Sequence, residues 1–154
     1  MPLSSRVAAA MTRIGTELKT IRSEVGVVNA KAKKWEQEIL VMAGTRELGY
    51  GPAELGIYVP FDIKLLGIRY AFETPTTSGT TTAELWLNRD YNFNSAGTQM
   101  SISALNTGQT LTGLGVGGAG ISVPAGSRLS CKVTAIGSGT IGSGLYMALW
   151  GEYT

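Results

Sequence analysis

Side chains that could carry out acid–base or nucleophilic chemistry are scarce in this sequence. The 154 residues include no histidine and one cysteine, Cys131. Without an imidazole there is no histidine general base, Ser-His-Asp triad or histidine-containing metal site. Cys131 alternates with Leu129 and Val133, which favours a small core residue over a nucleophile, and a lone cysteine excludes an internal disulfide.

Carboxylates are the remaining candidates for catalysis. A glycosidase needs two of them flanking one cleft, and Glu73, Glu84 and Asp90 are the plausible choices. Charged side chains at strand ends more often serve solubility, and nothing in the sequence brings two of these three together. We therefore predict a protein that is not an enzyme, with no cofactor and no bound metal.

One glycine pattern imitates a nucleotide-binding motif. Gly115, Gly117 and Gly120 have the GxGxxG spacing. A dinucleotide site also needs a preceding strand, a following helix and an acidic residue about 20 positions later. The glycines instead stand between two β-like segments, and the next acidic residue is Glu152. We predict a glycine-rich loop.

A segment that leaves an expected strand concentrates groups suited to recognition. Its candidate residues are Trp86, Arg89, Asp90, Tyr91 and Phe93. Aromatic faces stack on sugars, planar polar groups bind hydroxyls, and Tyr, Trp and Arg are enriched in protein interfaces. The same residues could instead pack locally and form a turn. Local packing, a protein interface and glycan binding all remain open interpretations.

The element expected to carry the molecule is an N-terminal helix with an unbroken 4-3 hydrophobic spacing. Apolar residues recur every 3.5 residues on average, the period of a coiled coil. The predicted oligomerisation residues are Val7, Met11, Ile14, Leu18, Ile21, Val25, Val28, Ala32, Trp35 and Ile39.

The heptad favours three or four parallel helices, and we predict three. Isoleucine at d positions beside leucine or methionine at a positions disfavours a parallel dimer. Between neighbouring chains, Glu17 would face Arg22 and Lys31 would face Glu36. Two glycines at positions 15 and 26 weaken the helix by about 1 kcal/mol each, so association must stabilise it. The alternative is one amphipathic helix packed on its own domain.

A change of pattern divides the chain into three parts. Residues 1–43 are predicted as a helical stalk for oligomerisation and docking, 44–56 as a glycine-rich connector, and 57–154 as a β domain. Strands are expected over 57–59, 63–73, 81–88, 99–105, 121–123, 128–136 and 145–153. The fold class is thus mainly β with an N-terminal α-helix: a trimeric coiled coil followed by an antiparallel, jelly-roll-like β-sandwich.

Charge and hydropathy exclude several partners. Thirteen Lys and Arg against eleven Asp and Glu give a net charge of +2. The one basic cluster, Lys31, Lys33 and Lys34, lies on polar helix faces and lacks interleaved aromatics, so no nucleic-acid partner is expected. We also expect no membrane insertion, because no run of 18 apolar residues occurs, and no signal peptide, because polar residues recur from Ser4 onward.

Two stretches resemble known phage proteins. Residues 3–10 (LSSRVAAA) and 14–19 (IGTELK) resemble the N-terminal helix of small tail and fibre proteins of phages that infect actinobacteria. The Val59-Pro60 step, the strand pair that follows it to Asn88, and the Val-Pro-Ala-Gly turn at 123–126 are similar to jelly-roll modules of phage tail, head-fibre and decoration proteins.

The resemblance implies a virion structural protein that is assembled in the bacterial host cytoplasm. Its implied partners are two further copies of itself and other proteins of the tail or capsid. A decoration protein that bridges capsid shell subunits and a module that binds host surface glycans are the alternative functions.

Overall fold

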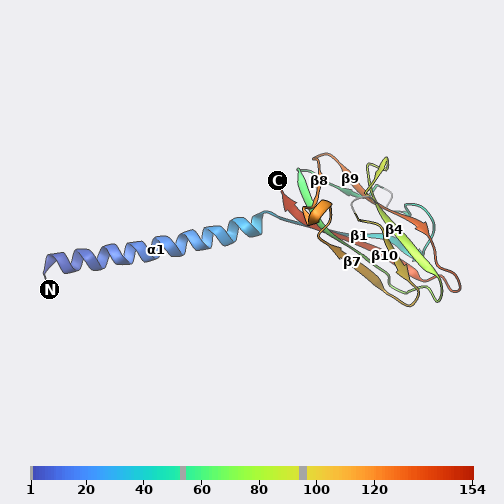
Figure 1. Ribbon diagram of the computed structural model, residues 1–154, viewed down its shortest axis with the longest axis horizontal. Helices are drawn as coiled ribbons and strands as arrows, with labels where there is room; N and C mark the ends of the chain where they lie inside the picture. Colours follow the sequence, from blue (N-terminus) through green and yellow to red (C-terminus); the bar gives the residue numbers. More distant parts are fainter. Residues whose placement is uncertain (1, 53–54, 94–96) are drawn as a thin grey trace. The chain divides into compact units, whose positions relative to one another are not determined.

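The computed structural model describes residues 2–52, 55–93 and 97–154, except for the side chains of residues 3 and 29–32. The chain forms two compact units, Met1–Lys34 and Trp35–Thr154. The first is a helix and the second consists of antiparallel strands, so the protein is mainly β with one N-terminal helix (Figure 1).

Helix α1 (Leu3–Ala32) is shorter than the sequence predicts. It begins at the carbonyl of Pro2, which accepts hydrogen bonds from the amides of Ser5 and Arg6. The prediction that the helix continues to residue 43 is wrong, because the chain is extended from Lys34 onward. Ala32 is the last helical residue, and its side chain lies outside the described ones.

Strand β1 (Lys34–Thr45) contains the two predicted stalk residues Trp35 and Ile39. The correction has a simple physical reason: a step of four residues keeps a side chain on one face of a helix and also on one face of a strand. Trp35 and Val41 are buried and Ile39 is partly buried, whereas Glu36 and Glu38 are exposed. Trp35 and Ile39 therefore belong to the β core, and the predicted Lys31–Glu36 pair loses its helical register.

In the described part of the chain, ten strands form two sheets of five. The first sheet comprises β1, β10 (Ser143–Tyr153), β3 (Ile63–Ala71), β7 (Gly108–Thr112) and β8 (Ile121–Val123), with β7 and β8 both paired to β3. The second sheet comprises β2 (Ile57–Tyr58), β9 (Arg128–Ala135), β4 (Thr80–Leu87), β5 (Tyr91–Asn92) and β6 (Met100–Ser103), with β5 and β6 both paired to β4.

Each of the seven strands expected from the sequence has an observed counterpart, with ends shifted by a few residues. The strand that closes the chain, β10, ends at Tyr153 and pairs with β3 from Tyr146↔Ala71 to Tyr153↔Ile63. Strands β5 and β7 were not expected, since each is short and lies among polar residues.

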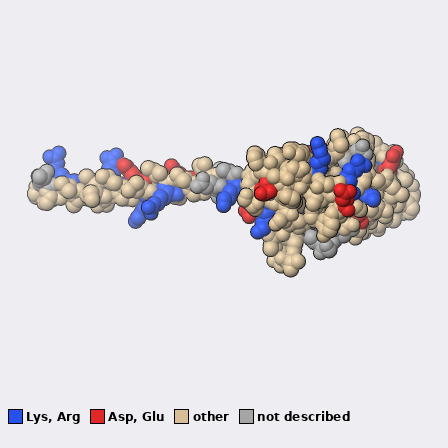
Figure 2. Space-filling model, turned by 90° about the horizontal axis from the view of Figure 1, so that it is seen from above, with Lys and Arg blue, Asp and Glu red and all other residues tan. Residues whose placement is uncertain are grey.

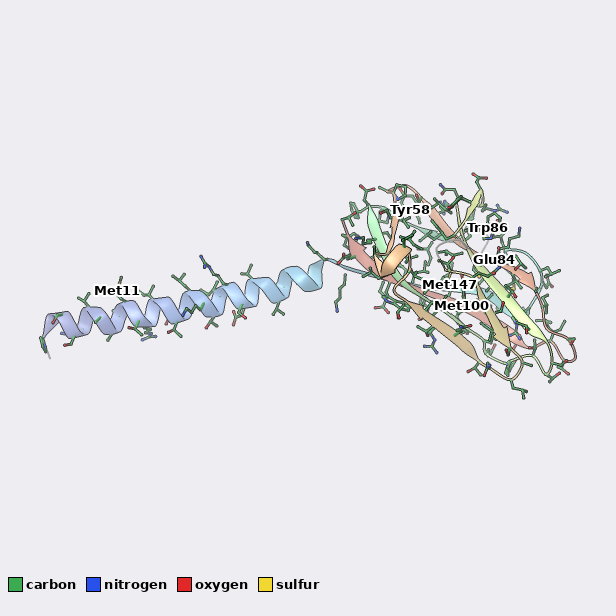
Figure 3. The ribbon with its side chains drawn as sticks, viewed as in Figure 1. Met11, Tyr58, Glu84, Trp86, Met100 and Met147 are labelled. Atoms are coloured by element: carbon green, nitrogen blue, oxygen red, sulfur yellow. The ribbon has the colours of Figure 1, made fainter. Side chains whose placement is uncertain are left out.

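The core lies between the sheets and draws on alternate residues of each strand. In β4, Ala83 and Leu85 are buried as their alternation predicts, and in β9 Cys131 lies inward with 2 % exposure. In the first sheet Leu145, Met147 and Leu149 of β10 meet Ile63, Leu65, Ile68 and Tyr70 of β3 in the same hydrophobic cluster. We call the unit Trp35–Thr154 the head; Figure 3 labels Met147 and Met100 within it.

The expected connector over 44–56 is more ordered than its glycines suggest. Gly44 and Thr45 end β1, and Gly49 forms a bridge with Val133 of β9; residues 53 and 54 lie outside the described ones. Arg46 is fully buried: its Nη1 donates to the carbonyls of Thr74, Ser143 and Gly144 at 2.7, 2.9 and 3.2 Å.

The glycine-rich segment after β7 is a loop with one short 3-10 helix, η2 (Val116–Gly118). Gly115, Gly117 and Gly120 all have positive φ, the conformation that favours glycine. The segment leads from β7 into β8 and not into an α-helix, as the sequence analysis predicts for a loop.

Candidate functional site

The helix presents seven apolar side chains to solvent along one face. These are Val7, Met11, Ile14, Leu18, Ile21, Val25 and Val28, each between 51 % and 67 % exposed. We call them the helix stripe; Figure 3 labels Met11, one of its members. Contiguous exposed apolar surface of this kind is typical of interaction sites.

Polar side chains on the other faces of α1 satisfy one another locally. The hydroxyls of Thr12, Thr16 and Thr20 donate to the carbonyls four residues earlier, and Arg13 pairs with Glu17 at 2.9 Å. In the single chain Glu17 thus pairs within its own helix, so a contact with Arg22 of a neighbour stays a prediction. An exposed pair of either kind contributes about 0.3–0.5 kcal/mol.

The predicted recognition loop is a tight turn between β4 and β5. Leu87 pairs with Tyr91, and Asn88 and Arg89 adopt positive φ angles of 51° and 66° between them. Asn88 is fixed from both sides, because its amide donates to the Arg128 carbonyl and its Oδ1 accepts from the Arg128 amide, each at 2.8 Å. These two hydrogen bonds give Asn88 a structural role in the turn.

Trp86 belongs to a network on the outer face of the second sheet. Its indole N–H donates to Glu84 Oε2 at 3.1 Å, and the ammonium of Lys132 lies 4.5 Å from its ring centroid. Tyr50 contacts the Trp86 ring edge-on at 6.2 Å. We call Tyr50, Glu84, Trp86 and Lys132 the Trp86 cluster; Glu84 and Trp86 are labelled in Figure 3.

Glu84 is the centre of that network. It is only 7 % exposed, and its Oε1 accepts from Gln99 Nε2 at 2.6 Å and from Thr134 Oγ1 at 3.2 Å. With Trp86 it has three neutral donors, and Lys132 is its cross-strand partner in the register. A carboxylate that accepts three hydrogen bonds stabilises the surface of the sheet.

The other members of the predicted loop divide between core and surface. Phe93 is 6 % exposed and packs edge-on against Tyr91, with ring centroids 5.4 Å apart. The guanidinium of Arg89 lies 4.9 Å from the Tyr50 ring. Asp90 and Tyr91 face solvent. The structure thus brings Trp86 and Arg89 together through Tyr50, a residue that the sequence analysis did not consider.

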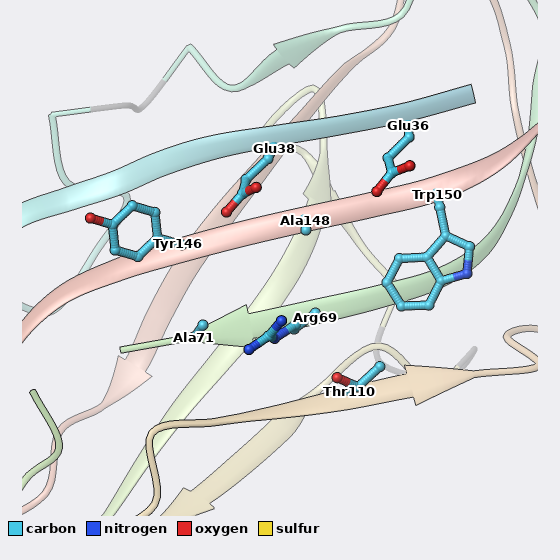
Figure 4. A pocket seen from close by; sticks show the side chains of 8 residues that line it. All are labelled: Glu36, Glu38, Arg69, Ala71, Thr110, Tyr146, Ala148 and Trp150. Carbon is cyan, nitrogen blue, oxygen red and sulfur yellow. The ribbon is translucent and has the colours of Figure 1, made fainter. Parts of the chain in front are cut away.

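A second site, on the outer face of the first sheet, has no counterpart in the sequence analysis. A groove of about 490 Å³ is lined by Glu36, Glu38, Arg69, Ala71, Thr110, Tyr146, Ala148 and Trp150. We call it the Trp150 groove. Figure 4 shows Tyr146 and Trp150 at its two ends, the two glutamates on the β1 side, and Arg69 and Thr110 on the other.

Strand register explains why this face is hollow. Ala148 pairs with Arg69, which pairs with Thr110, and Tyr146 pairs with Ala71. The two alanines form a low floor, and the rings stand four residues apart on β10, roughly 13 Å at strand rise. In the sequence, the feature that points to this groove is the alternation of Tyr146, Ala148 and Trp150 along one strand.

Charged groups in the Trp150 groove have no ion-pair partner among the side chains that the structure describes. No Lys or Arg nitrogen of the described residues lies within 4.0 Å of the Glu36 or Glu38 carboxylate. Within the same part of the chain, the Arg69 guanidinium and the Trp150 indole N–H make no hydrogen bond. The groove thus offers acceptors on one side, donors on the other and a ring at each end.

The three candidate catalytic carboxylates lie on separate elements. Glu84 is on β4, Asp90 is in the following turn, and Glu73 follows β3, where Ser143 Oγ donates to it at 3.5 Å. Across residues 2–52, 55–93 and 97–154, no three His, Cys, Asp or Glu side chains gather as metal ligands would. Burial raises the pKa of the Cys131 thiol, so the thiol stays protonated.

Charged side chains of both signs are interspersed on the face of the head that Figure 2 presents. No helix in the described part of the chain combines the length and the apolar character needed to cross a bilayer.

Comparisons with known proteins assign no family. No protein-family model matches the sequence, and no curated protein matches it. Among solved structures, the chain is similar to the Podospora anserina GH26-CBM35 β-(1,4)-mannanase at a TM-score of 0.39 and 16 % identity. The match covers 80 % of this chain and 28 % of the mannanase chain, so this chain spans less than a third of that protein. Likeness at this level carries no functional assignment.

Proposed function

We propose that this protein is a non-enzymatic structural protein of a bacteriophage virion, a minor tail or fibre component. In this proposal the N-terminal helix docks and trimerises, and the β-sandwich forms a displayed head. The observation that carries the proposal is the helix stripe, seven apolar side chains in 4-3 spacing that are all more than half exposed.

A second copy of the same helix is the occupant that best fits the helix stripe. The 3.5-residue period of the stripe matches only a partner that supercoils with it, which a copy of itself does. Isoleucine at the d positions 14 and 21 favours three strands over two. After correction for β1, the heptad runs from Val7 to Ala32 and has lost its last two predicted members, Trp35 and Ile39.

The head is proposed to be a jelly roll. Strands β1 and β3 belong to the first sheet and β2 and β4 to the second, so the chain alternates between the sheets. Later in the chain, β9 lies between β2 and β4, and β10 lies between β1 and β3. Strand β10 therefore pairs with β1 and β3, and β9 pairs with β2 and β4, across long stretches of sequence, which is typical of Greek-key connections. The virion assignment rests on the sequence resemblance to phage tail, fibre and decoration proteins, which extends over most of the chain.

Cysteine cross-linking tests the parallel trimer. Leu18→Cys places a thiol at an a position, where identical residues of parallel helices meet, and Ser23→Cys places one on the opposite face. Cys131 is buried and does not compete. Three thiols can form one disulfide, so mild oxidation of Leu18→Cys should link two chains of every three, and Ser23→Cys should stay unlinked. Equal linking of both variants would contradict the proposed face.

The virion assignment is tested on particles. Antibody raised against the full chain should label intact particles of the encoding phage at the tail in electron micrographs. Label over the shell would replace the tail assignment with that of a capsid decoration protein, and unlabelled particles would contradict the virion assignment.

A receptor-binding role is the second candidate, and the Trp150 groove is the observation that favours it. The groove is open, partly polar and lined by unpartnered groups, unlike the Trp86 cluster, whose polar groups bind one another. Three copies of the head, held together by their helices, would raise the avidity of a weak site well above that of one contact.

A further inference from the structure

We infer that the Trp150 groove binds a short stretch of an uncharged polysaccharide, with sugar rings stacked near Tyr146 and Trp150 and their hydroxyls bound by Glu36, Glu38 and Arg69. The inference names the ligand class of the receptor-binding role proposed above, on which it rests, and does not depend on helix assembly. All lining residues belong to the unit Trp35–Thr154.

The two rings set the length and the stacking surfaces of the site. Trp150 and Tyr146 stand on the same face of β10, each partly exposed, with only Ala148 between them. Aromatic side chains present an apolar face with a polar tip, which suits a ligand that is apolar on its ring faces and polar at its rim. Their spacing of roughly 13 Å accommodates a chain of rings lying along the strand.

Hydrogen-bonding groups along the sides are mixed in kind. Glu36 and Glu38 can only accept hydrogen bonds when ionised, whereas Arg69 and the Trp150 indole can only donate. A hydroxyl donates and accepts, so one polyhydroxylated ligand can satisfy both sides at once. These groups are preorganised on paired strands, with Arg69 held between Ala148 and Thr110 in the register.

Electrostatics argue against a protein surface as the occupant. A flat partner would remove water from two carboxylates and one guanidinium that have no ion-pair partner among the described side chains, and each unpaired buried charge costs several kcal/mol. A sugar chain in an open groove leaves water at its edges, and water-mediated bonds are nearly as favourable as direct ones. The two carboxylates against one cation also disfavour an acidic polysaccharide.

Titration of the full chain with a panel of soluble hexasaccharides tests the inference. The panel comprises α- and β-linked hexamers of glucose, mannose and galactose, with a galacturonic acid hexamer as the acidic probe. Binding is followed by calorimetry and by tryptophan fluorescence. Probe concentrations reach about 10 mM, so that a Kd in the millimolar range, which corresponds to roughly 4 kcal/mol, can be measured.

At least one neutral hexamer should bind and shift the tryptophan emission, and the acidic hexamer should bind more weakly. Arg69→Ala and Glu36→Gln replace exposed side chains, so both should fold normally and lose affinity at least tenfold. Tyr91→Ala is the matched control, an exposed ring removed from the predicted loop, and should keep affinity within about twofold.

Three results would overturn the inference: no neutral hexamer binds, binding persists in Arg69→Ala, or binding is lost in Tyr91→Ala instead. The variant Ile21→Asp separates this test from the test of helix assembly. Because the groove lies within one head, the disassembled variant should bind a free hexamer as tightly per chain as the parent does.

Discussion

The indole of Trp150 lies across Gly67, its cross-strand partner on β3. A methyl group on Gly67 would overlap the Cε2, Cζ2 and Nε1 atoms of the ring. The absence of a side chain on one strand therefore sets the orientation of the ring on the next. That ring forms one end of the Trp150 groove (Figure 4).

Gly67→Ala should displace the indole and destabilise the head. Forcing an extra methyl into a packed site costs about 1–3 kcal/mol, so the free energy of unfolding in urea should fall by that amount and the Trp150 emission should change. Gly44→Ala is the matched control: a methyl there meets nothing within 4 Å. Equal effects of the two changes would contradict this role for Gly67.

Ile21→Asp should abolish assembly of the helix. It places one carboxylate per chain at the centre of the proposed bundle, where isolated charges cost several kcal/mol. Ser23→Asp adds the same charge on the opposite face and should assemble like the parent. Light scattering gives the mass of each variant, and thermal unfolding of the head should be unchanged in both. Normal assembly of Ile21→Asp would show that the assigned face is wrong.

Glu84→Ala should reveal the Trp86 cluster as a structural element. Trp86, Gln99 and Thr134 would each lose a charged acceptor, and a hydrogen bond to a charged group contributes about 1.5–3 kcal/mol. We expect a loss of about 2–3 kcal/mol in the free energy of unfolding.

The double variant Arg89→Ala with Tyr91→Ala is the comparison for Glu84→Ala. It removes exposed side chains of the turn and should cost at most about 0.5 kcal/mol. If the turn variant were the more damaging, these side chains would contribute to the core, and the structural role assigned to Glu84 would be wrong.

Stability should fall at alkaline pH because of Cys131. Burial raises the pKa of its thiol above the ordinary 9.0, so above that pH the unfolded chain has lost a proton that the folded chain keeps. Stability is therefore full below about pH 9 and falls as pH rises, by up to about 1.4 kcal/mol per pH unit. Urea unfolding at several pH values measures the slope.

Cys131→Ala provides the control for that slope. It should remove the dependence between about pH 9 and 10 and leave a decline at higher pH, because burial also raises the pKa of Tyr70 well above 10.0. An unchanged slope in Cys131→Ala would contradict the assignment to the thiol.

Local alternation predicted seven strands between Ile57 and Tyr153, since the longer ones bury alternate side chains against one core, whereas β5 and β7 bury no side chain and were missed. Strand β1 was missed because Trp35 and Ile39 fit a helical and an extended period equally. The deciding feature is nonlocal: β1 pairs with β10, more than a hundred residues later in the chain.

The Trp150 groove could not be predicted from the sequence for the same reason. Strand pairing brings Arg69, Thr110 and Ala148 into one row, although they lie on three separate strands. The predicted loop was identified from composition alone, which could not show that Tyr50 and Lys132 contact Trp86 from other elements.

Sedimentation equilibrium of the full chain at micromolar concentration tests the central claim, assembly through the helix stripe, most directly. We expect one species of three times the 16.2 kDa chain mass. A species of twice that mass would mean that the core preference of the heptad is misread. A single species of 16.2 kDa would contradict the account, because the exposed stripe would then have no partner among copies of the chain.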